Sequence, residues 1–249
     1  MLNLNGKWAL VTGASRGVGT HIATALADLG CNVVLHSRSK EHTAGLAATL
    51  RKDGVSVIVV AAELDDQNQV DAMLNRILAQ VPQIDILFNN AAIMAPYRAN
   101  PWQTTAEDYR TSFEVNVISL ARICNRLVPL MLERKWGRVV NLTSGIINQP
   151  HLTAYAVSKA AVDKYVRDFA LSLSGSGVMM NLLDPGWLRT DLGGPNAPGD
   201  PSSVIPGGLV PALLDDGISG RFFRAQDYAG MSISDALVLG ATLQPWNDG

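Results

Sequence analysis

The sequence has few cysteines, little net charge and no cluster of basic residues. Its 249 residues include two cysteines, Cys31 and Cys124, and carry a formal net charge of −2. Two cysteines are too few for a disulfide framework, and these two lack the spacing of metal ligands. A nearly neutral chain without a basic cluster is not typical of a nucleic-acid-binding protein or of one attached to an anionic membrane. We therefore expect no metal, no nucleic-acid partner and no membrane partner.

Long apolar segments are absent as well. The first eight residues lack the apolar region of a signal peptide. No uninterrupted apolar run approaches the roughly 20 residues of a membrane span. Because 47% of the residues are hydrophobic and 17% are charged, a chain of this length can bury one large core. These features predict a cytoplasmic protein with a single α/β domain over residues 1–249.

What the sequence does contain is a regular alternation of short apolar runs with segments of helical period. The runs are rich in Val, Ile and Leu, as strands covered on both faces are. The predicted strands are 7–12, 32–37, 55–61, 84–89, 137–143 and 178–183. The predicted helices are 18–29, 41–52, 67–80, 105–116 continuing towards 133, and 154–173. This alternation predicts a doubly wound parallel sheet of about seven strands with helices on both faces.

Residues 185–208 differ from the rest of the chain in composition. They contain five prolines and several glycines directly after the sixth predicted strand. Long loops in compact domains are usually lids or binding loops, so we expect a substrate loop here. The tail, residues 225–249, contains a predicted helix over 233–243 whose role the sequence leaves open.

The first predicted strand runs into the segment T-G-A-S-R-G-V-G at residues 12–19. Gly13, Gly17 and Gly19 stand where this strand turns into a helix. Glycines there allow a tight turn and a close approach of the backbone to a pyrophosphate, and the helix N-terminus supplies N–H donors. A glycine triplet in this strand–turn–helix context predicts a dinucleotide-binding site.

The end of the second predicted strand indicates which dinucleotide binds. NAD-binding sites place an acidic residue about 20 residues after the glycines, but here that position is Ser37, followed by Arg38. Arg38 can bind a 2′-phosphate, and Arg16 in the glycine segment can add a second contact. NADP(H) is therefore favoured over NAD(H). The alternative is that both arginines are solvated surface charges.

Tyr155 and Lys159 lie four residues apart in Y-A-V-S-K, on one face of a predicted helix. An ammonium group near a phenol favours the phenolate and so lowers its pKa from about 10 towards neutral pH. A tyrosine with such a pKa can serve in acid–base catalysis. Taken alone, however, the pair also occurs by chance on solvated helices.

With the segments already quoted, several further motifs occur in order along the chain, and the sequence resembles the short-chain dehydrogenase/reductase family. The resemblance extends from about residue 7 to residue 224 and implies a Rossmann-like fold. Its motifs are T-G-x-x-x-G-x-G at 12–19, N-N-A-A at 89–92, Asn116 in E-V-N-V, Ser144 in N-L-T-S-G, Y-A-V-S-K at 155–159 and D-P-G-W-L-R-T at 184–190.

The resemblance implies four catalytic residues. Tyr155 is expected to be the general acid in ketone reduction and the general base in alcohol oxidation. Lys159 is expected to stabilise the phenolate and to bind the nicotinamide ribose. Ser144 is expected to orient the carbonyl, and Asn116 to belong to a proton relay through a water beside the lysine.

The resemblance also implies the residues that contact the cofactor. Glu63 stands where the family often has an aspartate near adenine, so Leu64 is the better supported contact of the two. The expected set is Gly13, Ser15, Arg16, Gly17, Val18, Gly19, Ser37, Arg38, Glu63, Leu64, Asn90, Ala91, Ala92, Tyr155, Lys159, Pro185, Gly186, Leu188 and Thr190.

The residues that follow these motifs are candidates for the substrate pocket, and most of them are apolar. They are Met94, Ile146, His151, Trp187 and Leu192. They favour a hydrophobic ketone or aldehyde as the small-molecule substrate, or an alcohol in the reverse reaction. The resemblance thus implies an NADPH-dependent carbonyl reductase.

Other functions remain open at this stage. One is a 3-oxoacyl-[acyl-carrier-protein] reductase, for which Arg122 and Arg126 could form a basic face towards the acidic carrier. The interpretation we favour is that these arginines pair with acids at a subunit contact, because the family commonly forms homodimers or homotetramers. The others are an NAD(P)-dependent alcohol or polyol dehydrogenase and an NADP-binding sensor without turnover.

Overall fold

A computed structural model describes residues 2–246 and contains one seven-stranded sheet. The strands are β1 Trp8–Val11, β2 Asn32–Ser37, β3 Val57–Ala61, β4 Ile86–Asn89, β5 Gly137–Leu142, β6 Val178–Asp184 and β7 Phe222–Arg224. Their order is β3-β2-β1-β4-β5-β6-β7, and every neighbouring pair is parallel. The predicted doubly wound parallel sheet is confirmed.

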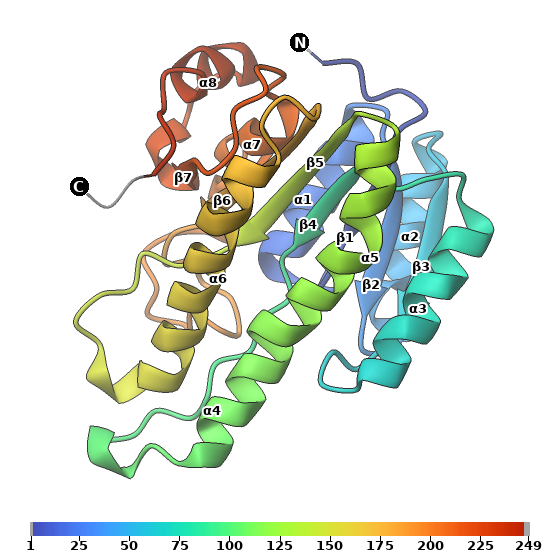
Figure 1. Ribbon diagram of the computed structural model, residues 1–249. Coiled ribbons are helices and arrows are strands. Elements are labelled where there is room, and N and C mark those ends of the chain that lie inside the picture. The colour runs from blue at the N-terminus through green and yellow to red at the C-terminus, as the bar shows by residue number, and fades with distance from the viewer. Residues whose placement is uncertain (1, 247–249) are drawn as a thin grey trace.

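Helices cover both faces of the sheet, as Figure 1 shows with α3, α5 and α6 in front. The α-helices are α1 Gly17–Asp28, α2 Glu41–Lys52, α3 Gln67–Gln80, α4 Ala106–Phe113, α5 Ser119–Glu133, α6 Thr153–Ser172, α7 Val210–Leu213 and α8 Ile233–Gly240. One core cluster joins the sheet to α1, α2 and α7, and a second joins it to α3, α5 and α6.

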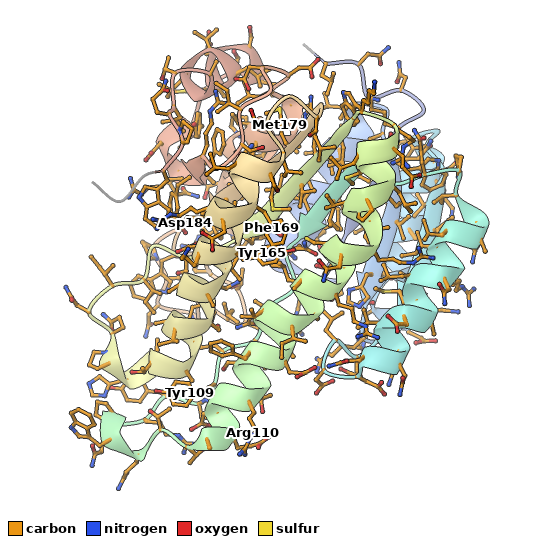
Figure 2. The ribbon with its side chains drawn as sticks, in the orientation of Figure 1. Tyr109, Arg110, Tyr165, Phe169, Met179 and Asp184 are labelled. Atoms are coloured by element: carbon orange, nitrogen blue, oxygen red, sulfur yellow. The ribbon has the colours of Figure 1, made fainter. Side chains whose placement is uncertain are left out.

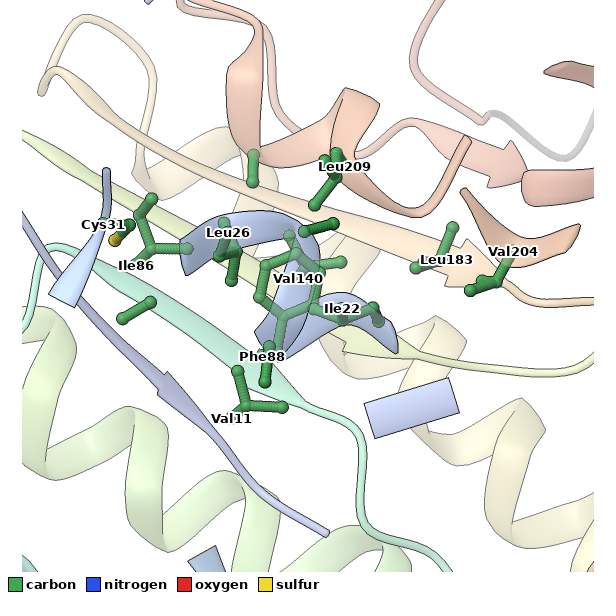
Figure 3. Close-up of a cluster of buried hydrophobic side chains, with 14 of the residues drawn as sticks. Val11, Ile22, Leu26, Cys31, Ile86, Phe88, Val140, Leu183, Val204 and Leu209 are labelled. Atoms are coloured by element: carbon green, nitrogen blue, oxygen red, sulfur yellow. The ribbon is translucent and has the colours of Figure 1, made fainter. Parts of the chain in front are cut away.

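The two clusters arise from the alternation of side chains along each strand. In β1, Val11 belongs to the first cluster and Leu10 to the second. Ile22 of α1 packs in the first cluster with Phe88 and Val140 from the central strands (Figure 3). Burial of one such side chain contributes about 1.5–3 kcal/mol, so this face holds the start of α1 firmly against the sheet.

The long helix predicted from residue 105 towards 133 is continuous but contains an irregular turn. A π-helical turn, η2 Glu114–Ile118, separates α4 from α5. Asn116 lies in this turn, and its side chain hydrogen-bonds both the N–H and the carbonyl oxygen of Ile93. Single π turns inside helices frequently occur at functional sites. Here the turn directs a polar side chain towards the loop after β4.

By length and composition, the continuous helical stretch Ala106–Glu133 could cross a membrane. The sequence has no uninterrupted apolar run long enough to span a membrane, but the mean hydropathy over 18 residues of this stretch reaches 1.4. Core helices of soluble proteins can have the same length and hydropathy, and Leu120, Leu127 and Met131 of this stretch are buried in the second cluster.

Several element boundaries follow the predictions closely, and others do not. The bounds of β2, α2 and α3 are those expected. The seventh strand, which had no predicted location, is the three-residue β7. The predicted loop 185–208 includes the 3-10 helix η4 Pro201–Val204 and leads into η5 Gly207–Leu209. The helix expected over 233–243 ends at Gly240, and residues 247–249 of the tail lie outside the described part of the chain.

The strand order fixes where a ligand binds. The chain leaves β1 towards β2 on one side, while β4 lies on the other side of β1. In open parallel sheets, ligands bind beyond the carboxyl ends of the strands at such a switch point. The glycine segment after β1 and the N-N-A-A segment after β4 both lie there.

Candidate active site

The glycine segment between β1 and α1 forms a narrow cradle. Gly13 and Gly17 have φ angles of 66° and 58°, in the left-handed region that favours glycine. A Cβ at Gly13 would lie 2.9 Å from the Cα of Ala91, and one at Gly19 would overlap the Gly13 carbonyl oxygen. The N-cap of α1 makes no side-chain cap. The first N–H groups of α1 are therefore left for an anion, and the cradle fits a dinucleotide pyrophosphate.

Asn90 and Thr12 hold this cradle in shape. The Asn90 amide donates to the carbonyl oxygens of Thr12, at 2.8 Å, and of Gly13, at 3.1 Å. The Thr12 hydroxyl accepts from the backbone N–H groups of Asn90 and Ala91, each at 3.0 Å. The predicted residues Gly13, Asn90 and Ala91 are thus brought together, and the Asn90 side chain stabilises the glycine segment by binding two of its carbonyl oxygens.

His36 is a residue of this cradle that the sequence reasoning missed. Its Nδ1 accepts from the Gly13 N–H at 3.2 Å, and its Nε2 lies 3.1 Å from the Ala62 carbonyl oxygen. The first contact requires a bare Nδ1 and the second a protonated Nε2, so the ring is neutral. Burial lowers the pKa of His36 to about 4. The only available signal was a polar residue inside an otherwise apolar strand.

The residues expected near the adenosine end lie at the carboxyl ends of β2 and β3. Ser37 is buried and its hydroxyl donates to the Ser39 carbonyl oxygen, whereas Arg38 is exposed. Leu64 is buried and Glu63 is exposed. Arg38 is therefore accessible to a phosphate. The hydroxyl of Ser37 is engaged in the turn after β2, so Ser37 is a weaker candidate for a side-chain contact with the cofactor.

Arg16, expected to add a second contact to a 2′-phosphate, forms an ion pair within the chain. Its guanidinium lies 2.8 Å from the carboxylate of Asp191 in the substrate loop, and both side chains are well exposed. A Cβ at Gly17 would lie 2.9 Å from Cγ2 of Thr190. The loop after β6 therefore lies against the glycine segment, which brings Thr190 to the edge of the cradle.

Tyr155 and Lys159 project from the first turns of α6 and are both buried. The Lys159 ammonium donates to the Leu142 carbonyl oxygen at 2.9 Å and lies 5.8 Å from the centre of the Tyr155 ring. The hydroxyl of Ser144, which follows β5, hydrogen-bonds the Tyr155 hydroxyl. The three predicted residues are therefore brought to one place by β5 and α6.

The expected lowering of the pKa of Tyr155 is wrong for this structure. Burial raises that pKa to about 12, the hydrogen bond from Ser144 opposes the rise, and the negative charge of Asp184 adds to it. Burial likewise lowers the pKa of Lys159 to about 8, against the opposing charges of Asp163 and Asp184. The sequence shows the spacing of the pair, but not that Lys159 turns to a backbone carbonyl or how deeply the phenol is buried.

Asn116 connects the active-site helix to the loop after β4. Its amide nitrogen donates to the Ser158 hydroxyl at 2.9 Å, and that hydroxyl donates to the Tyr155 carbonyl oxygen at 2.7 Å. These bonds, with the two to Ile93, satisfy the buried amide. The structure therefore places Asn116 against α6 next to Ser158, and its part in a proton relay stays a prediction.

The predicted substrate-pocket residues, most of them apolar, lie on the three loops after β4, β5 and β6, and we call them the apolar rim. Trp187 is 62% exposed, with its indole N–H donating to the Gly193 carbonyl oxygen at 2.8 Å. His151 stacks on Tyr97 at 5.0 Å, and its Nδ1–H donates to the Arg98 carbonyl oxygen. Met94 is exposed, and Ile146 and Leu192 are partly buried. The sequence reasoning missed Tyr97 and Trp102, both largely exposed in the loop after β4.

Comparison with known proteins shows the family of this chain. Residues 7–200 match the family model described as short chain dehydrogenase. The chain belongs to the short chain dehydrogenase family. With its dehydrogenase and reductase relatives, this protein is an NAD(P)-dependent oxidoreductase acting on CH–OH or C=O groups.

Individual family members are similar at about one third identity. A short chain dehydrogenase of Pseudocercospora fijiensis is 32% identical over 198 residues, which are 78% of this chain and 63% of that protein. This chain therefore spans less than two thirds of that relative. A 3-oxoacyl-[acyl-carrier-protein] reductase of Synechocystis sp. is 32% identical over 195 residues, covering 77% of this chain and 78% of the relative.

Among solved structures, an angucycline C-6 ketoreductase with bound NADP has the same fold. Its TM-score is 0.80 at 28% identity, with 93% of this chain and 97% of that chain covered. The short chain dehydrogenase fold, the glycine cradle and the free amides of α1 together fit a nicotinamide dinucleotide.

Proposed function

We propose that this short chain dehydrogenase is an NADPH-dependent carbonyl reductase that converts a hydrophobic ketone or aldehyde to an alcohol in a reversible reaction. The observation that carries this proposal is the buried Tyr155, hydrogen-bonded by Ser144 and one helical turn from Lys159. Because burial raises its pKa to about 12, Tyr155 holds its proton at neutral pH. A protonated phenol is the form that can donate to a carbonyl oxygen during reduction.

The protein's residues bind, orient and move protons around the reacting carbonyl. The cofactor supplies the hydride when bound. Tyr155 donates its proton to the oxygen on which negative charge develops, and Ser144 holds that oxygen by a hydrogen bond. Lys159 compensates the charge left on the phenolate, and Asn116 links the helix to the path by which the proton is replaced.

The choice of NADP(H) rests on the end of β2. No carboxylate stands where an acid would select the ribose hydroxyl of NAD, and the exposed Arg38 is available to a phosphate. The structurally similar ketoreductase binds NADP. Arg16 contributes less to this proposal, because it is paired with Asp191.

The apolar rim supports a hydrophobic substrate over a carrier-bound or acidic one. The guanidinium of Arg98 is paired with Asp108 by two hydrogen bonds. Arg122, considered above as part of a carrier-binding face, is paired with Asp71 of α3 within the same chain. Arg126, the second arginine of that face, is exposed, and its charge acts on the same Asp71. A carrier-protein reductase therefore has less support from the site, although several relatives have that name.

The test is a comparison of Tyr155→Phe with the wild type. We expect turnover of a carbonyl substrate to fall by a factor of about 10²–10⁴, because the change removes only the acid–base group. The dissociation constant for NADPH, followed by its fluorescence, should change less than about threefold. Tyr165→Phe is the matched control, since Tyr165 is on the same helix outside the site. Wild-type turnover in Tyr155→Phe would contradict the assignment.

The oligomeric state and the cellular location are separate proposals. We propose a homodimer or homotetramer in the cytoplasm. Light scattering after size-exclusion chromatography would show a particle of two or four times 26.6 kDa, and a monomer at micromolar concentration would contradict it. Fractionation of cells should recover the protein with the cytosolic proteins.

A further inference from the structure

Asp184 is the last residue of β6, and the roles proposed above leave its carboxylate unused. Figure 2 shows it beside α6, the helix that carries Tyr155 and Lys159. Its Oδ1 accepts a hydrogen bond from the Gly186 N–H at 2.9 Å. The N–H of Gly145 makes a second hydrogen bond to the same carboxylate. The side chain is therefore fixed on two sides.

The two amides belong to two different parts of the active site. Gly145 directly follows Ser144, and Gly186 lies at the start of the substrate loop. A Cβ at Gly145 would lie only 2.7 Å from Oδ2 of Asp184, so the carboxylate packs closely against the Ser144 turn. The Asp184 side chain thus joins the turn that carries Ser144 to the first turn of the substrate loop, which lies against the glycine cradle.

The charge of Asp184 also acts on the two titrating residues of the site. It raises the pKa of Tyr155 and opposes the lowering of the pKa of Lys159 by burial. Burial raises the pKa of Asp184 itself, while the two amides and Arg224 of β7 oppose the rise. Asp227 from the segment after β7 adds negative charge.

Asp163 is the other carboxylate near this group, and its position differs. It lies one turn after Lys159 on α6 and accepts a hydrogen bond from Thr143. Its charge acts on Lys159, whereas the charge of Asp184 acts on both Lys159 and Tyr155. Both acids thus contact the segment around Ser144, but of the two only Asp184 acts on Tyr155 and also binds the turn that opens the substrate loop.

We propose that Asp184 is a positioning residue, which holds the Ser144 turn against the substrate loop and supplies a negative charge facing both Tyr155 and Lys159. This inference rests on the proposed carbonyl reduction. It predicts that loss of the charge shifts the pH dependence of kcat/KM. It also predicts that displacing the carboxylate, and with it the two hydrogen bonds, lowers kcat, because Ser144 then orients the carbonyl less well.

The test compares Asp184→Asn and Asp184→Glu with the wild type in carbonyl reduction across pH. Reduction requires a protonated Tyr155 and a charged Lys159, and Lys159, with its pKa of about 8, loses its proton first as the pH rises. The charge of Asp184 raises the pKa of both residues, so Asp184→Asn should shift the alkaline limb of kcat/KM to lower pH by at least about half a unit. Asp184→Glu keeps the charge but misplaces it, so kcat should fall about tenfold with the limb near that of the wild type. The control, Asp168→Asn, removes an exposed carboxylate from α6 and should change neither.

A readout independent of turnover separates this inference from the proposed function. The phenolate absorbance near 295 nm, taken as the difference from Tyr155→Phe in each background, reports the titration of Tyr155 directly. A lower midpoint in Asp184→Asn supports the role of the charge, even if no carbonyl substrate is turned over and the proposed function fails. An unchanged limb and midpoint in folded Asp184→Asn overturns it. If that variant does not fold, a wild-type kcat in Asp184→Glu overturns it instead.

Discussion

The two ends of the candidate active site, the glycine cradle for the cofactor and the apolar rim for the substrate, are built in different ways. The cofactor end is formed by backbone: glycines without room for a Cβ, a helix N-terminus, and hydrogen bonds from Asn90 and His36. The substrate end is formed by large side chains on loops, among which Trp102 is 94% and Ile147 75% exposed. Close backbone approach tolerates few residue types, whereas an exposed rim tolerates many. The first end therefore indicates the cofactor class, and the second only the polarity of the substrate.

The largest expected effect comes from adding one methyl group to the cofactor end. In Gly19→Ala the new Cβ would overlap the Gly13 carbonyl oxygen and lie 2.5 Å from the Asn90 amide nitrogen. Because both belong to the cradle, we expect the dissociation constant for NADPH to rise about 100-fold or more, measured by fluorescence titration. Gly45→Ala is the matched control: no atom lies within 4 Å of a Cβ there, and α2 should gain about 0.5–1 kcal/mol.

Acid should weaken the cofactor end through His36. Its pKa is lowered from 6.5 to about 4 in the folded protein, so the unfolded chain takes up a proton first as the pH falls. The stability present above pH 6.5 is then lost progressively down to about pH 4, by about 3 kcal/mol in total. Urea unfolding at several pH values would measure this loss. His36→Gln, which cannot titrate, should lose less stability over the same range, and an equal loss would contradict the account.

The Arg38→Ala change sharpens the comparison within the cofactor end. If Arg38 binds the 2′-phosphate, its removal should weaken NADPH binding by about tenfold or more and leave NADH binding within about twofold. NADH serves as the internal control, because it shares every other contact. Equal weakening of both cofactors would show that Arg38 supports the fold at the end of β2 and does not select the phosphate.

The substrate end should respond more gently. Trp187→Ala removes a large apolar surface from the rim, so KM for a bulky apolar ketone should rise about fivefold, while kcat for a small ketone stays within about twofold. Leu171→Ala is the control, since Leu171 is 86% exposed on the same protein and lies 16 residues along α6 from Tyr155. Equal effects on both ketones would place Trp187 outside the pocket.

Much of the fold and of the cofactor end could be predicted from the sequence. The apolar periodicity placed β2, α2 and α3, and the glycine spacing placed the cradle, because both patterns have a local physical cause. The π turn at Asn116 could not be predicted in this way. It depends on hydrogen bonds to Ile93, a residue 23 positions away along the chain. The three-residue β7 is likewise too short to show a period.

The chemistry of the site depended most on tertiary structure. Residue spacing brought Tyr155 and Lys159 onto one helix face, but burial, with smaller effects of nearby groups such as Asp184, set the pKa values. Asp184 stood inside a recognised motif, yet its hydrogen bonds to the N–H groups of Gly145 and Gly186 appear only after β5 and β6 are paired.

The most direct test of the account is the affinity of the wild-type protein for NADPH and for NADH, followed by a carbonyl panel with the preferred cofactor. We predict that NADPH binds at least about tenfold more tightly, through the phosphate contact of Arg38, and that a hydrophobic ketone or aldehyde is reduced. A preference for NADH would contradict the argument from Ser37 and Arg38. It would direct the search for substrates to alcohols and polyols that the enzyme oxidises.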